Sequence, residues 1–247
     1  MTPLPEAARA QLAPHGRLRA ALNHSNFLLV SSRAPDAAGV APTLARELAR
    51  RANAVVEFVG YENAGLAADA AAADAWDVAF IGAEPARARD IRFSPAYVEI
   101  EATYLVPAAS PLRSIDEVDR AGIRIATTAR AAYTLYLQRT LQHATIVEAE
   151  TIPAAFELFT ASRLDALAGL KPRLLDDVKN LPGAKLLDGR FTAVQQSIAV
   201  RHDRAAAADY LASFVDEIIA SGWLRTIVEQ HGAHGLTIAA RPAGAQP

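Results

Sequence analysis

Apolar and polar positions follow two different periods in the first part of the chain. Short apolar or β-branched runs predict strands at 17–22, 54–60 and 77–81. Leucine and alanine at helical spacing predict helices at 42–52 and 65–73, between those strands. The order βαβαβ is typical of a parallel sheet with helices on its faces. We therefore predict an α/β unit here.

The same pattern starts again after an extended segment at 102–107. Ser114–Glu117 has the spacing of a capping box, in which the Ser hydroxyl and the Glu carboxylate each accept a backbone N–H. Further strands are predicted at 122–126, 145–148, 164–168, 184–187 and 193–200. Further helices are predicted at 131–142, 153–162, 172–178, 204–220 and 222–231. The pattern indicates a second α/β unit, after which the chain returns to the first.

Two α/β lobes joined by two crossing strands are the predicted architecture. We expect lobe 1 to comprise 1–104 and 197–240, lobe 2 to comprise 105–196, and 241–247 to be a flexible tail rich in turn-forming residues. Two connecting strands make a hinge, and a cleft between hinged lobes is a natural place for a small ligand.

Composition narrows the possible partners. The chain has 247 residues, 51% of them hydrophobic, with 25 Lys and Arg against 27 Asp and Glu, so the sequence predicts no nucleic-acid partner. It has no cysteine, which excludes disulfides and thiolate metal sites. No apolar run reaches the ~18–20 residues of a membrane helix, so we expect no membrane insertion. The N-terminus has no secretory signal pattern, so a chain complete as written would be cytoplasmic.

Familiar catalytic motifs are absent from the sequence. It contains no GxSxG, HExxH, GxxxxGK[ST] or GxGxxG. His231 and His234 share a metal-like spacing, but no carboxylate ligand lies near them in the sequence. We therefore predict no catalytic residue, no metal and no cofactor, although a catalytic set scattered along the chain would escape this search.

A cluster of arginines follows the buried strand at 77–81, within the segment AEPARARDIRFSPAY. Arg87, Arg89 and Arg92 could solvate a loop or pair with Glu84 and Asp90, and for Arg89 and Arg92 we prefer this interpretation. The alternative is a site that grips an anion, because a planar guanidinium offers paired donors to a carboxylate.

The chain resembles the family 3 extracellular solute-binding proteins, which have the type II periplasmic binding fold and supply polar amino acids to ABC importers. The resemblance runs in order from about Gly16 to Gly232. It rests on the segments RLRAALN, GVAPTLARELARR, WDVAFIGAEPARARDIRFSPAYVEIEATYLV, VDRAGIRIATTARAAYTLYL and SRLDALAG. The resemblance implies a periplasmic, monomeric protein with a membrane permease of the ABC type as a partner.

The resemblance also implies a binding site in lobe 1. In this family an Arg six residues before the Phe of F-[ST]-x-P-Y pairs with the carboxylate of the ligand, and Arg87 stands six before Phe93. Aromatic walls usually enclose the ligand side chain, although Phe27 and Tyr61 could equally be ordinary core residues. The further candidates in this lobe are Asn23, Gly82, Ala83 and Glu84.

Lobe 2 departs from the family pattern. The usual Gly-[ST]-[TS] is replaced near the turn by Ala129–Tyr133, where Tyr133 is a candidate and Arg130 is either a second anion contact at a helix N-terminus or a solvated residue. The Asp that holds an ammonium is replaced by Leu170, followed by Lys171. A buried ammonium needs a partner, so the sequence predicts a small carboxylate or dicarboxylate ligand that lacks a conventional α-ammonium.

Three functions are compatible with this reading of the sequence. The first is capture of an anionic ligand for ABC-type uptake or for sensing. The second is an enzyme on the same scaffold, such as a cyclohexadienyl dehydratase-like lyase, for which Glu84 would be the general acid. The third is a protein that has lost binding.

Overall fold

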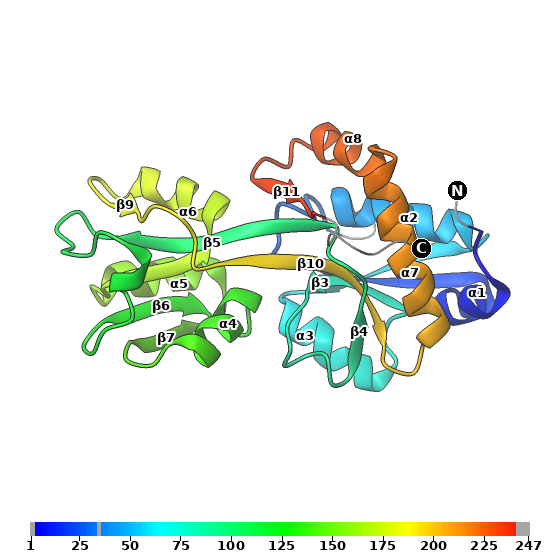
Figure 1. Ribbon diagram of the computed structural model, residues 1–247, viewed down its shortest axis with the longest axis horizontal. Helices are drawn as coiled ribbons and strands as arrows, with labels where there is room; N and C mark the ends of the chain where they lie inside the picture. The colour runs from blue at the N-terminus through cyan, green and yellow to red at the C-terminus, as the bar shows by residue number, and fades with distance from the viewer. Residues whose placement is uncertain (1–2, 34–35, 241–247) are drawn as a thin grey trace. The chain divides into compact units, whose positions relative to one another are not determined.

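The structure, a computed structural model, describes residues 3–33 and 36–240 (Figure 1). The described residues form two compact units, unit 1 within 1–99 and 195–240 and unit 2 from 100–194. Strand β5 (Val98–Val106) carries the chain from unit 1 into unit 2, and β10 (Thr192–Arg201) carries it back. The predicted tail at 241–247 lies outside the described residues. The division into two lobes that move about a hinge stays a prediction.

Unit 1 is built on a mixed sheet in the strand order β2-β1-β3-β10. Its parallel strands are β1 (Arg17–Asn23), β2 (Val55–Tyr61) and β3 (Val78–Gly82), and β10 runs antiparallel to β3 and to the short β4 (Ile91–Phe93). The other elements of this unit are α1 (Glu6–Leu12), α2 (Val40–Arg51), α3 (Ala64–Asp69), α7 (Ala205–Ala220), α8 (Trp223–Gln230) and β11 (Leu236–Ile238).

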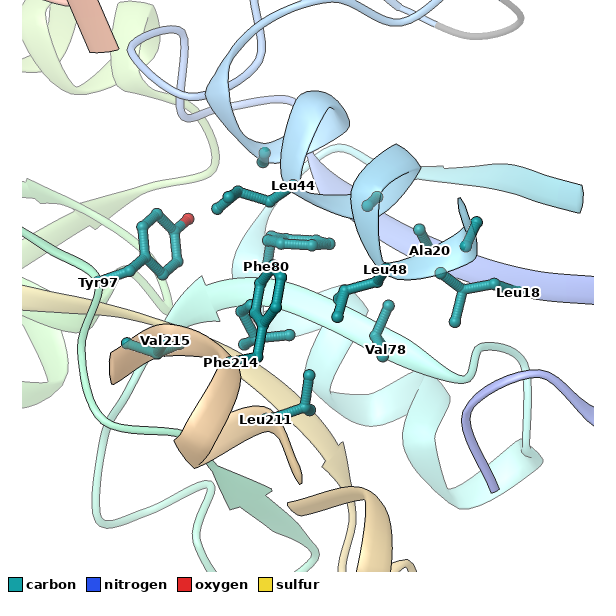
Figure 2. Close-up of a cluster of buried hydrophobic side chains, with 14 of the residues drawn as sticks. Leu18, Ala20, Leu44, Leu48, Val78, Phe80, Tyr97, Leu211, Phe214 and Val215 are labelled. Carbon is teal, nitrogen blue, oxygen red and sulfur yellow. The ribbon is translucent and has the colours of Figure 1, made fainter. Parts of the chain in front are cut away.

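Side chains of the unit 1 strands alternate between two hydrophobic cores, as the two-residue period of a strand requires. Leu18 and Ala20 of β1 belong to the larger core, with residues of α2 and α7 (Figure 2). Ala21 belongs to the smaller core on the other face, with Trp76, whose indole N–H donates to the carbonyl of Ala67 in α3 at 2.8 Å. Both faces of the sheet are therefore covered.

Unit 2 repeats this plan on a sheet with the order β5-β8-β6-β7. Strands β6 (Arg124–Thr128), β7 (Thr145–Ala149) and β8 (Ala166–Leu170) are parallel, and β5 pairs antiparallel with β8 and with the short β9 (Lys185–Leu186). Its helices are α4 (Ala132–Thr140), α5 (Ile152–Ala161) and α6 (Lys171–Asp177). Ile125 and Ala126, successive residues of β6, lie in different cores, so this sheet also buries both faces.

The predicted α/β class is confirmed, and the observed elements differ from the predicted ones in two ways. Helix α1 and strands β4 and β11 were not predicted. The predicted capping box is wrong for its Ser half, because Ser114 makes no side-chain cap and the residues after it form only a 3₁₀ turn, Ile115–Glu117. The Glu117 carboxylate accepts the backbone N–H of Arg113 at 2.6 Å and also interacts with the backbone N–H of Ser114.

Helix length and apolarity bear on membrane insertion. Within 3–33 and 36–240, no helix has the length and the apolar character that crossing a bilayer requires.

Candidate functional site

The carboxyl ends of the unit 1 parallel strands bring several predicted residues to one edge of the sheet. Asn23 and Tyr61 end β1 and β2 and are partners in the register of that pair. The neighbouring strand β3 ends at Gly82. In open α/β sheets, ligands bind beyond the carboxyl ends of the strands. This edge is therefore the part of unit 1 best placed to hold a ligand.

Asn23 orders the loop that follows β1. Its side-chain oxygen accepts the backbone N–H of Ser25 at 3.1 Å and the Ser25 hydroxyl at 2.7 Å. Such a local bond fixes a turn. Phe27, in the same loop, leaves 39% of its surface exposed, whereas Tyr61 packs against the smaller core and burial raises its pKa. Phe27 is therefore the more exposed of the two predicted aromatic residues at this edge.

His24 fastens the same loop to β2, a role that sequence reasoning missed. Its backbone N–H donates to the Tyr61 carbonyl at 2.8 Å. Its ring lies against Gly60, where an added Cβ would stand 2.2 Å from Nε2. Burial and the nearby Arg33 lower the pKa of His24. The glycine and the histidine are far apart in the chain, so only a prediction of strand pairing could have linked them.

The turn after β3 holds Arg87 in a buried position, with 7% of its surface exposed. Its guanidinium donates from Nη1 to the Gly82 carbonyl at 2.7 Å, and its backbone N–H donates to the carbonyl of Glu84, itself largely buried, at 2.9 Å. The backbone N–H of Ala83 donates to the Gln195 carbonyl at 2.8 Å, so this donor serves the fold. The turn therefore fixes a cation at the end of a buried strand.

The two neighbouring arginines behave as solvated residues. Arg89 is ion-paired with Asp90 at 3.0 Å, and its side chain is largely exposed. Arg92 donates to the carbonyl of His202 at 2.6 Å. The predicted pairing of Arg89 with Asp90 is thus confirmed, and Arg89 provides a matched control for substitutions of Arg87.

In unit 2 the corresponding edge holds the turn between β6 and α4. Arg130 lies in this turn with φ at 59°, a left-handed conformation that is uncommon for residues other than glycine. The hydroxyls of Thr127 and Thr134 are 2.6 Å apart, and the Thr134 hydroxyl donates to the Thr128 carbonyl at 2.7 Å. These buried contacts lock the first turn of α4 onto β6.

Tyr133 is packed inside unit 2. It is buried in the first turn of α4, and burial raises its pKa to about 12. Its phenol lies near Thr128, the last residue of β6, with which it makes a hydrogen bond that lowers the pKa and partly opposes the effect of burial.

Lys171 is paired within unit 2, which sequence reasoning did not foresee. Its Nζ lies 2.8 Å from a carboxylate oxygen of Glu101, and Arg190 approaches the other oxygen at 3.4 Å. The hydrogen bond from Lys171 lowers the pKa of Glu101. The preceding Leu170 is buried. Glu101 therefore offsets the positive charge that the sequence suggested at this edge.

The two histidines with metal-like spacing show no metal-binding geometry. The His231 ring nitrogen Nε2 lies 2.9 Å from the Thr43 hydroxyl. In the part of the chain that the structure describes, no three His, Asp or Glu side chains are grouped to hold a metal ion.

Comparisons with known proteins give consistent results for this architecture. The profile of bacterial extracellular solute-binding proteins, family 3, matches residues 25–234. A mutant of ArgBP from T. maritima has a TM-score of 0.74 at 18% identity, over 92% of this chain and 100% of that chain. AbpA from Streptococcus pneumoniae, a substrate-binding protein of an amino acid ABC transporter bound to L-arginine, has a TM-score of 0.72 at 17% identity, over 90% and 97%.

A third structure links the fold to an enzyme. An ancestral amino acid-binding protein, described as a precursor of cyclohexadienyl dehydratase, has a TM-score of 0.73 at 19% identity, over 90% of this chain and 98% of that chain. The comparison with curated proteins gives no match. The predicted type II periplasmic-binding-protein fold is confirmed by the structural matches.

Proposed function

Because the chain belongs to the family 3 bacterial extracellular solute-binding proteins, we propose that it captures a small carboxylate-bearing ligand, for uptake through an ABC-type membrane permease or for sensing. The observation that carries this proposal is the buried guanidinium of Arg87, held by the Gly82 carbonyl at the carboxyl end of β3. The family predicted from the sequence is confirmed, and the ligand is the proposal.

A guanidinium fixed in this way is suited to an anion. Arginine carries five N–H donors in a planar fork, and its match to a carboxylate adds direction to the electrostatic attraction. The bond from Nη1 to the Gly82 carbonyl sets the plane of the fork, so less rotational freedom is lost when an anion binds. The exposed Phe27, on the loop fastened by His24, offers apolar surface to the rest of the ligand.

The ligand in this proposal lacks an α-ammonium. An ammonium bound beside buried Leu170 would have no carboxylate partner from that residue, and a buried unpaired charge is strongly unfavourable. The neighbouring Lys171 is itself a cation and is already paired with Glu101. The apolar Leu170, and not the neutralised Lys171, therefore favours a dicarboxylate such as succinate or glutarate. The competing class is an α-amino acid, since structures with this fold have been solved with L-arginine, lysine and glutamine.

Isothermal titration calorimetry with succinate, glutarate, L-glutamate, L-arginine, L-lysine and L-glutamine tests the proposal. We expect a dicarboxylate to bind and Arg87→Gln to weaken it roughly 10- to 100-fold, since a charge-assisted hydrogen bond contributes about 1.5–3 kcal/mol. Arg89→Gln is the matched control and should leave affinity unchanged. Binding of only the α-amino acids, or equal affinity in Arg87→Gln, would contradict the proposal.

A lyase activity is the second candidate. Glu84 is buried beside Arg87 in the same turn, which would place an acid near a carboxylate-binding cation. The similarity to a dehydratase precursor supports testing this activity. Incubation with prephenate or arogenate should yield an aromatic product, and Glu84→Gln should abolish it. Absence of product with the unmodified protein would eliminate this candidate.

A further inference from the structure

Five buried side-chain oxygen atoms in unit 1 lack a hydrogen-bond partner among the described residues, those of Asn26, Tyr97, Gln196, Ser197 and Tyr210. Three of these five are the hydroxyl of Tyr97, the side-chain oxygen of Gln196 and the side-chain oxygen of Asn26. The three residues are 0%, 4% and 5% exposed. Buried polar atoms in folded proteins are almost always hydrogen-bonded, because an unsatisfied one is destabilising. Three such atoms in one unit therefore require an explanation.

Tyr97 and Gln196 lie on the same face of the sheet. The Tyr97 ring packs edge-on against Phe80 in the larger core, with centroids 6.5 Å apart (Figure 2). Alternation along β10 places Gln196 on the face of Ile198, a member of that core. Gln196 stands opposite Gly82, which has no side chain to fill the space. The backbone N–H of Tyr97 also donates to the Gln196 carbonyl at 2.9 Å.

Asn26 approaches this region from the loop after β1. Its backbone carbonyl accepts the N–H groups of Leu29 and Val30, which belong to the same core. The Leu29 carbonyl in turn accepts the N–H of Ala41, in the first turn of α2. Figure 2 shows the Tyr97 hydroxyl directed toward Leu44, one turn further along that helix. The loop and the tyrosine therefore both lie near the first two turns of α2.

The chemistry of the three atoms is complementary to one small molecule. Two are amide oxygens, which accept hydrogen bonds, and burial raises the pKa of Tyr97, so its hydroxyl keeps the proton that it can donate. A water molecule can donate to both amide oxygens and accept from the phenol. Buried waters typically make about three hydrogen bonds to such groups. We propose that unit 1 binds one buried water between Tyr97, Gln196 and Asn26.

The position of this water gives it a structural role. Tyr97 immediately precedes β5, and Gln196 lies in β10. These are the two strands by which the chain leaves unit 1 and returns to it. The water joins the base of both strands to the loop after β1. This role is independent of the proposed ligand, so failure of either proposal leaves the other intact.

Removal of the Tyr97 hydroxyl tests the proposal through the sign of the stability change. If the hydroxyl holds a water, Tyr97→Phe should lower Tm by about 2–6 °C, because the bridge is lost and two acceptors remain. If the hydroxyl is unsatisfied, removing it should leave Tm unchanged or raise it, and that result would overturn the proposal. Tyr136→Phe, in unit 2, is the control for loss of a tyrosine hydroxyl elsewhere.

A double-mutant cycle and a crystal structure complete the test. Gln196→Met keeps the shape of the side chain without its acceptor, and its effect should be smaller on the Tyr97→Phe background. Strictly additive effects would contradict a shared water. High-resolution crystals of the unmodified protein should show density within about 2.7–3.2 Å of all three atoms, and empty density would overturn the proposal. A Tm that differs between sodium, potassium and tetramethylammonium chloride would instead assign a cation.

Discussion

The two units contain the same clasp between an arginine and an aspartate, in different surroundings. In unit 1 the backbone N–H of Arg19 donates to the carboxylate of Asp77 at 2.8 Å, and the Asp77 N–H donates back to the Arg19 carbonyl at 2.8 Å. In unit 2, Arg124 and Asp165 make the same two bonds at 2.8 and 3.0 Å. Each clasp joins the central strand to the start of the third strand.

The surroundings of the two clasps differ in burial and in charge. The Asp77 side chain is 1% exposed and receives a second guanidinium, from Arg204, at 2.8 Å. The Asp165 side chain is 38% exposed, and its arginine Nε stands 3.7 Å away. Removing one partner of a buried ion pair is strongly destabilising, whereas exposed pairs contribute little. We therefore expect burial, and not the motif, to determine the energetic importance of the clasp.

Neutralising the two aspartates in turn gives the largest expected difference. Asp77→Asn should lower the free energy of unfolding of unit 1 by about 3–5 kcal/mol, because two arginines lose their buried counter-charge. Asp165→Asn, the matched variant of unit 2, should change stability by about 1 kcal/mol or less. Urea unfolding followed by circular dichroism reports on both units, and tryptophan fluorescence reports on unit 1, because Trp76 and Trp223 both lie there. Equal effects of the two variants would contradict the comparison.

Acid should weaken unit 1 through the same carboxylate. Burial alone would raise the pKa of Asp77, but the hydrogen bonds from Arg19 and Arg204 outweigh it and lower that pKa. The stabilisation of unit 1 by the ionised Asp77 is therefore complete above the ordinary Asp pKa of about 4. It is lost as the pH falls through the lowered pKa that Asp77 has in the folded protein. Between these two pKa values, the contribution of Asp77 to the free energy of unfolding should change with a slope that approaches about 1.4 kcal/mol per pH unit. Unfolding between pH 2 and 7 measures it, and an identical slope in Asp77→Asn would rule out this assignment.

Alanine substitution at two strand glycines, one in each unit, tests how closely neighbouring side chains approach the strand backbone. Gly60→Ala would place a Cβ 2.2 Å from the His24 ring, whereas Gly169→Ala in unit 2 would meet the Leu174 side chain at 3.1 Å. We expect Gly60→Ala to cost about 1–3 kcal/mol, as overpacking does, and Gly169→Ala to cost less. Thermal unfolding by circular dichroism compares them. A larger loss for Gly169→Ala would refute the role of His24 as a fastener.

The smallest expected effect concerns the turn of unit 2. Arg130 has a left-handed backbone, which glycine adopts without the penalty of a Cβ. Arg130→Gly should therefore be about 1 kcal/mol more stable than Arg130→Ala, since both variants lose the guanidinium. Chemical unfolding followed by circular dichroism measures the difference. Equal stability of the two variants would show that the turn has changed conformation.

Sequence patterns predicted the strands better than the contacts of the site. Runs such as that of β3 are apolar and β-branched because both faces of the sheet are covered, so their periodicity identifies them. The pairing of Lys171 with Glu101 and the contact of His24 with Gly60 depend on strand register, which no local pattern specifies. Helix α1 was missed because its seven residues have only two buried positions, Ala8 and Leu12, too few for a periodic signal.

The interrupted course of unit 1 along the chain has a consequence for biosynthesis. Its sheet includes β10, and its larger core includes residues of α7 and α8, all of which follow unit 2 in the sequence. A ribosome that has made the first 99 residues has therefore produced β3 without its antiparallel neighbour. Unit 2 is the continuous segment 100–194, so all of it is translated before the part of β10 that pairs with β3. Nascent unit 2 can thus fold first. Residues 1–99 complete the sheet and the larger core of unit 1 only after β10, α7 and α8 have been translated.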